Sequence, residues 1–139
     1  MSAFTKFYDF VEQLGAGVHN FSSHSIKVYL SNEVPLVTDT VKADIAEITA
    51  GNGYTAGGAS ITPVWSETAG VAILTGTDVT WTATGGPIGP FRYVILYNDS
   101  ATNDNLIGWW DYGSELTINA DEAFEAFKTD FGSSILTIS

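Results

Sequence analysis

Two histidines, His19 and His24, occur in the chain, and both follow an apolar segment that ends in glycines. A catalytic histidine works beside a nucleophile or a carboxylate that the fold brings to it. The sequence has no Gly-x-Ser-x-Gly turn, which presents the nucleophile of many serine hydrolases, and it has no cysteine. We therefore interpret both histidines as ordinary turn residues, and we predict a protein that is not an enzyme.

Acidic side chains are the next candidates for chemistry. Asp111 and Glu115 flank a tight turn at 112–114, and a glycosidase needs two carboxylates across a sugar cleft. A chain with sixteen acidic residues forms such pairs by chance, so solvated turn acids are the simpler interpretation.

The segment 98–105, NDSATNDN, concentrates side-chain oxygens in one loop. Ca²⁺ takes ligands of this kind, here Asn98, Asp99, Asn103 and Asp104. The loop lacks the spacing of an EF-hand, and Asn, Asp and Ser are also the residues of a plain hairpin turn. We predict no metal site and no cofactor.

Aromatic and proline-rich segments offer contact residues rather than catalytic ones. Trp109 and Trp110 are adjacent, so in a strand they point to opposite faces, and one of them belongs to the core. The other is buried under the N-terminal helix, contacts a second subunit or stacks on a sugar. Pro87, Ile88 and Pro90 form an apolar loop tip, which marks either a contact site or a loop folded back on the domain.

The elements that must position these residues begin with an N-terminal helix within residues 1–17. Its apolar residues fall on one arc at helical spacing, and charged or amide residues fall opposite. Ser2 can cap the start, and Gly15 or Gly17 can end the helix. The apolar arc is expected to lie on the domain's own sheet or, alternatively, on another subunit. The arc consists of Phe4, Phe7, Tyr8, Phe10, Val11 and Leu14.

From residue 24 onward the pattern is that of short strands and turns. Asn52-Gly53 is a strong turn signal, because both residues tolerate positive φ. The loop 85–90, rich in Gly and Pro, is not expected to join a central ladder. The stretch 91–97 is apolar on both faces and should be central. Strands are predicted at 26–30, 61–65, 71–74, 79–82, 91–97, 106–112 and 126–131, and another strand is predicted to begin with Leu116 and Ile118. One helical turn is possible at 44–48. A hairpin at 132–134 should lead from the last strand into 135–138.

This pattern predicts a mainly β fold, an antiparallel β-sandwich or small barrel of about eight strands with an N-terminal α-helix. We expect a single domain over residues 1–139, with the helix in 1–17 and the β domain in 24–139.

Composition excludes several functional classes. The 139 residues include sixteen Asp or Glu and five Lys or Arg, for a net charge of −11, and no cysteine. Zero cysteines exclude disulfides and thiolate metal ligands, and scattered basic residues argue against nucleic-acid binding. Asp9 and Glu12 interrupt the first apolar stretch, unlike a signal peptide, and no run is long enough to span a membrane. We expect a soluble protein whose partners do not include nucleic acid or a membrane.

Five sequence blocks together resemble a known family. They are FTKFYDFVEQLGAGVHNF (4–21), IKVYLSNEVP (26–35), ADIAEITAGNGYTAGG (43–58), TWTATGGPIGPFRYVILYND (80–99) and NDNLIGWWDYGS (103–114). In this order they resemble a family of small virion proteins encoded among the structural genes of tailed bacteriophages and prophages. The segment DEAFEAFKTDF (121–131) departs most from that family, whose members have a cleaner alternating strand there.

The resemblance implies a head decoration (cement) protein that binds outside the major capsid shell and stabilises it. It implies the major capsid protein as partner, a homo-oligomer (trimer or dimer) on the capsid, and a place on the virion exterior after synthesis in the bacterial cytoplasm. The alternative is a tail, neck or fibre protein, including a glycan-binding receptor module. The resemblance to the family transfers no catalytic residues to this chain. The candidate contact residues are apolar or aromatic residues beside expected turns: Phe4, Phe7, Tyr54, Pro87, Ile88, Pro90, Trp109 and Trp110.

Overall fold

The computed structural model describes residues 4–126 and 135–138. The chain is mainly β, with 46% strand against 9% helix and several antiparallel sheets packed together, so the predicted fold class is confirmed. The elements in chain order are β1 (Thr5–Lys6), α1 (Tyr8–Gly15), β2 (Ile26–Ser31), the 3-10 turn η1 (Lys42–Asp44), β3 (Ala59–Ser60), β4 (Val64–Thr68), β5 (Val71–Thr75), β6 (Val79–Thr82), β7 (Ile88–Asn98), β8 (Leu106–Ile118), β9 (Ala123–Ala126) and β10 (Leu136–Ile138).

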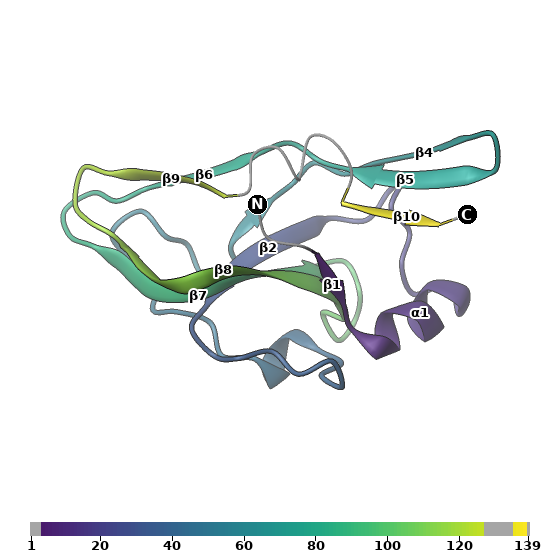
Figure 1. Cartoon of the computed structure of the whole chain (residues 1–139), viewed down its shortest axis with the longest axis horizontal. Coiled ribbons are helices and arrows are strands. Elements are labelled where there is room, and N and C mark those ends of the chain that lie inside the picture. Colours follow the sequence, from purple (N-terminus) through teal and green to yellow (C-terminus); the bar gives the residue numbers. More distant parts are fainter. Residues whose placement is uncertain (1–3, 127–134, 139) are drawn as a thin grey trace.

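A five-stranded sheet in the order β1-β8-β7-β2-β3 is the base of the fold. Its middle strand is β7, so the prediction of a central strand at 91–97 is confirmed. Two smaller ladders, β10-β5-β4 and β6-β9, lie over one face of this sheet (Figure 1). The long connection from β2 to β3, which contains η1, lies on the other side (Figure 1).

Both faces of the central sheet are buried, and alternate residues of β7 supply the two cores. Val94 and Leu96 face the main core, which lies between the sheet and the smaller ladders. Ile95 and Tyr97 belong to a second cluster on the opposite face. The connection that carries η1 closes this second cluster, because the Tyr29 hydroxyl donates to its backbone carbonyls, at 3.1 Å to Ile45 O. Burial on both sides explains why β7 is apolar on both faces from Tyr93 to Tyr97.

The N-terminal helix starts later than predicted. Residues 5 and 6 form β1 and pair with Trp109 and Gly108 of β8, and α1 begins at Tyr8 after an extended Phe7. The reason is packing, because the Phe4 ring occupies the space left by Gly108 and contacts Trp110, with ring centroids 4.9 Å apart. The helix ends at Gly15, as predicted. The proposed Ser2 cap lies outside the described residues.

Two predictions around β7 and β8 were wrong. Residues 88–90 belong to β7, and Ile88 pairs with Ile118, although the loop 85–90 was expected to stay out of a ladder. Pro90 is accommodated because the register shifts between Ile88 and Phe91, where a missing N–H costs no regular ladder bond. Residues 106–118 form one strand instead of two, since Gly113 bends the chain at φ 98° without ending it.

The remaining strands agree in part. The prediction of 79–82 matches β6, that of 71–74 matches all but the last residue of β5, and that of 61–65 is displaced toward β4. Asn52 and Gly53 have φ of 56° and 103°, so the predicted turn is confirmed. The helical turn predicted at 44–48 lies earlier, at η1. The structure has ten strands among the residues it describes, against about eight predicted.

The C-terminal prediction needs correction. The strand predicted at 126–131 begins earlier, as β9, and the rest of that range lies outside the described residues. The hairpin turn at 132–134 also lies outside them. Among the described residues on either side of this turn, β9 pairs with β6 and β10 pairs with β5, and each completes a different ladder over the main core.

Candidate binding surface

The two carboxylates considered for catalysis have separate partners. Arg92 binds Asp111 with two nitrogens, at 2.8 and 3.1 Å, and this pairing lowers the pKa of Asp111. Glu115 accepts a hydrogen bond from Asn32 Nδ2 at 2.8 Å. Each carboxylate therefore anchors neighbouring structure, and no step of glycoside hydrolysis can be derived from them.

The loop 98–105 is organised as a hairpin turn. Asn98 is fully buried, and its side-chain oxygen accepts from the backbone N–H of Ser100 and Ala101 at 2.9 and 3.2 Å. Asp99 pairs with Lys27 at 3.3 Å. Within 4–126 and 135–138 there is no cluster of three or more His, Asp or Glu that would hold a metal ion. The Asn98 side-chain oxygen is thus used by the turn itself, and the Asp99 carboxylate pairs with Lys27 of β2.

Four of the candidate contact residues have buried side chains, so their assignment as contacts is corrected; for Phe7, Ile88 and Trp110, burial was the alternative that the sequence left open. Phe7, Tyr54, Ile88 and Trp110 are at most 2% exposed. Each packs in one of the two cores, because the strands and turns beside them fold inward. We do not propose them as contacts with a partner.

The other four candidates differ in exposure. Pro87 and Pro90 are exposed, whereas Phe4 is half-buried over Trp110. Trp109 is also half-buried and packs on the ring of Phe7, with centroids 4.7 Å apart. The adjacent tryptophans therefore point to opposite faces, as predicted, and Trp110 is the core residue.

Tyr54 has a structural role that explains its burial. Its hydroxyl donates to Glu47 Oε2 at 2.6 Å and accepts from the backbone N–H of Leu30 at 3.0 Å. Glu47 also accepts from Gly57 N at 2.7 Å and from Lys42 Nζ at 2.9 Å. Burial and the bond to Glu47 raise the pKa of Tyr54. This network fastens the β2–β3 connection to the central sheet.

Exposed apolar side chains gather on helix α1. Tyr8 and Val11 are 69% and 58% exposed and lie about one turn apart, on the same side of the helix. The neighbouring Phe10 is buried and anchors the helix in the main core. The helix is therefore held from one side and presents apolar groups on the other.

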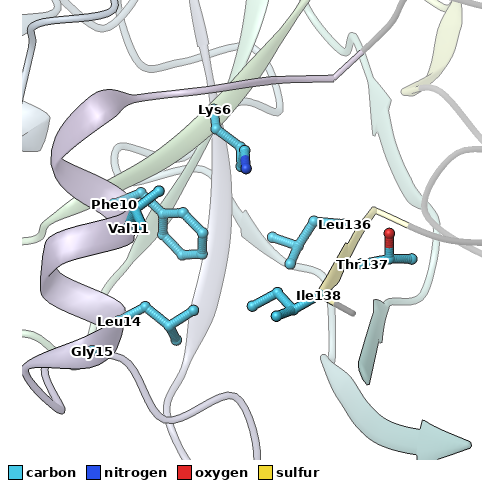
Figure 2. A pocket seen from close by; sticks show the side chains of 8 residues that line it. All are labelled: Lys6, Phe10, Val11, Leu14, Gly15, Leu136, Thr137 and Ile138. Atoms are coloured by element: carbon cyan, nitrogen blue, oxygen red, sulfur yellow. The ribbon is translucent and has the colours of Figure 1, made fainter. Parts of the chain in front are cut away.

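An apolar groove continues this surface toward β10. Its volume is about 360 Å³, which is within the range of small ligand sites, and Ile138 at its edge is 40% exposed. Figure 2 shows Phe10 and Leu14 facing Leu136 and Ile138 across it, with Lys6 near one end. The residues that line it are Lys6, Phe10, Val11, Leu14, Gly15, Leu136, Thr137 and Ile138.

The loop before η1 extends the exposed apolar area beside the start of α1. The backbone N–H of Tyr8 donates to Val37 O at 2.9 Å, and the adjacent Leu36 is 59% exposed. We define the α1 surface as Lys6, Tyr8, Val11, Leu14, Leu36 and Ile138. Exposed apolar side chains that lie near one another beside a groove are typical of protein interaction sites and ligand-binding grooves.

Sequence reasoning did not separate this surface from the core, because it placed Tyr8 and Val11 on one arc with Phe10 and Leu14, to lie on the domain's own sheet or on another subunit. That arc was calculated for a helix that included Phe4 and Phe7, which lie before the helix. A helix restricted to 8–15 has Phe10 and Leu14 four residues apart on its inner side, and Tyr8 and Val11 fall outside it. The signal for the later start of the helix was the pair Thr5-Lys6, which lies between Phe4 and Phe7. These two aromatic side chains pack on opposite faces of the sheet.

No helix in the described parts of the chain is long and apolar enough to cross a membrane. Comparisons with protein-family models, with curated proteins and with solved structures found no match to this chain.

Proposed function

We propose that the protein is a non-enzymatic structural component of a bacteriophage virion, a head decoration protein that binds the outer side of the major capsid shell. The resemblance of five sequence blocks to small phage virion proteins supports the family. The observation that supports binding is the α1 surface, where Tyr8 and Val11 are exposed on a helix anchored through Phe10.

The fold suits such a role because it holds the surface in place. β1 pairs with β8 directly before α1, and Phe4 and Phe7 pack on opposite faces of the sheet. A preorganised apolar surface loses little conformational freedom on binding, so more of the contact energy stabilises the complex. Repetition over many equivalent shell sites multiplies the effect of a modest single contact.

Helix α1 carries Asp9 and Glu12, and the other fourteen of the sixteen acidic residues lie outside it, where their charge fits contact with solvent. A net charge of −11 favours solubility, while the α1 surface has Lys6 near its apolar residues. The partner that fits this surface is an apolar patch of the shell, with a carboxylate within reach of Lys6. As a homo-oligomer, each copy would present the same surface to a symmetric set of shell subunits.

The experiment is binding of the purified protein to purified expanded heads, followed by cryo-electron microscopy. We expect added density at regular sites of the shell with α1 against it. The double variant Tyr8→Ser, Val11→Ser should reduce occupancy. Val64→Ser removes a side chain that is 56% exposed on β4, away from α1, and should bind as the native protein does. Binding to tails with no binding to heads would instead support the tail, neck or fibre alternative.

A further inference from the structure

The side chain of Asn98 joins the turn that follows β7 to the segment 18–25. It is fully buried, and its oxygen accepts from the backbone N–H of Ser100 and Ala101. These two backbone donors determine which way the amide lies, because only the oxygen can accept from them. The NH₂ group must therefore point away from the turn, toward the segment 18–25.

Both histidines meet this NH₂ group. Asn98 Nδ2 lies 3.1 Å from His19 Nδ1 and 3.0 Å from His24 Nδ1, with a longer contact of 3.5 Å to Val18 O. An amide nitrogen only donates, so each Nδ1 must be the acceptor and each imidazole carries its proton on Nε2. His24 Nδ1 also accepts from the backbone N–H of Asn20 at 3.2 Å. The geometry thus selects the neutral form of both rings.

The surroundings of His19 offer little compensation for a positive charge. Its ring is 6% exposed, stacks on Phe21 with centroids 6.0 Å apart, and lies 5.3 Å from Phe10. Its Nε2 has no hydrogen-bond partner in the described structure. Burial and the neighbouring His24 lower the pKa of His19 to about 4, against a smaller opposing effect of Asp9.

The charged groups near the cluster come from each element around it. Helix α1 contributes Asp9, which also accepts from Gln13 Nε2 at 3.2 Å. The end of β7 is followed by Asp99, whose charge is paired with Lys27 of β2 at 3.3 Å. The segment 18–25 contributes His24 itself. Asp9 is therefore the carboxylate that acts on His19, and it does not reverse the effect of burial.

We infer that His19, His24 and Asn98 form an acid-sensitive cluster, here called the clasp. It holds the segment 18–25 in place and, through the packing of His19 on Phe10, helps to fix the position of helix α1. A proton on Nδ1 of either ring places two donors opposite each other and breaks the bond to Asn98. The segment then opens and α1 loses the packing of His19 on Phe10. The clasp itself follows from the geometry alone. The expected consequence, weaker binding of the protein to phage heads at acid pH, rests on the proposed function.

The first test needs no variant. Nitrogen-15 NMR of the native protein should show both histidines as Nε2–H tautomers at pH 7.5. Amide hydrogen exchange within 18–25 should be protected at pH 7, and the protection factor should fall by up to roughly 100-fold by pH 4.5. An Nδ1–H tautomer of either histidine at neutral pH, or protection that does not change between these pH values, would overturn the proposal.

A second test replaces the hydrogen-bond donor of the clasp, the NH₂ group of Asn98, by an acceptor. Asn98→Asp keeps the oxygen that accepts from Ser100 and Ala101 but replaces the NH₂ by an acceptor, which favours protonated imidazoles. The titration midpoint of His19 should rise by about two pH units. Asn103→Asp adds the same charge to an exposed position of the same loop and should leave the midpoint unchanged. Equal midpoints in Asn98→Asp and native protein would contradict the clasp.

These outcomes are separable from the proposed function. Tautomers and exchange are measured on the isolated protein, so they decide the clasp even if heads do not bind it. Binding to heads at pH 7.5 decides the function even if the clasp is absent. If both hold, occupancy on heads should fall between pH 7 and pH 4.5 in the native protein more than in Asn98→Asp.

Discussion

The ring of Phe4 lies against the backbone of Gly108, in the space that a side chain at position 108 would need. A methyl group there would approach Phe4 Cε1 and Thr5 O to 2.6 Å each, well inside normal contact. This close approach lets β1 pair with β8 and places Phe4 on Trp110. It also sets where helix α1 can begin.

Gly108→Ala should therefore destabilise the protein. Overpacking at a site bounded by backbone costs about 1–3 kcal/mol, and the added methyl group meets Thr5 O as well as a ring. Chemical denaturation should show a lower midpoint, and the Phe4–Trp110 contact should be lost from nuclear Overhauser spectra. Gly15→Ala is the matched control, because nothing lies within 4 Å of its Cβ position and its stability should be unchanged or higher. Equal stability of the two variants would contradict this role of Gly108.

Tyr54→Phe tests the network that fastens the β2–β3 connection. The variant removes the part-buried bond to Glu47 and leaves the buried backbone N–H of Leu30 without its acceptor. Leaving a buried donor unsatisfied costs about 1–3 kcal/mol. Thermal unfolding should occur at a lower temperature, whereas Tyr8→Phe, at an exposed hydroxyl, should be neutral. If Tyr54→Phe unfolds with the native midpoint, the hydroxyl does not hold this connection.

The stability of the whole chain should depend on pH through His19. The folded state lowers its pKa from 6.5 to about 4, so the unfolded state binds the proton more readily. The free energy of unfolding should be highest above pH 6.5 and should fall by up to about 3 kcal/mol as the pH is lowered to 4. Urea titrations at several pH values measure this slope. In His19→Gln the decrease over the same range should be smaller, and an identical decrease would assign the pH dependence to carboxylates instead.

Several elements could be predicted from the sequence because local signals decide them. Alternating Val and Trp at 79–82 fit a half-buried strand, Asn52-Gly53 fits a turn with positive φ, and the two-sided apolar run at 91–97 fits a central strand. In each case the residues that determine the structure are adjacent in the chain.

Most of the errors have the opposite cause, since they depend on a distant partner. β1 forms because Gly108 makes room for Phe4, and β10 pairs with β5 more than sixty residues before it. Gly113 bends β8 without ending it, which no local pattern distinguishes from a turn. The α1 surface was missed for the same reason, because the exposure of Tyr8 and Val11 follows from where the helix starts.

The α1 surface is the central claim, and its contribution to head binding can be measured directly. Removing Tyr8 and Val11 together eliminates two apolar side chains, each worth up to about 1.5–3 kcal/mol when fully buried. The dissociation constant for purified expanded heads, from co-sedimentation at pH 7.5, should rise at least about tenfold in Tyr8→Ser, Val11→Ser. Val64→Ser should keep the native value. Equal affinity of native protein and the double variant, with both folded, would contradict the assignment of α1 as the binding surface.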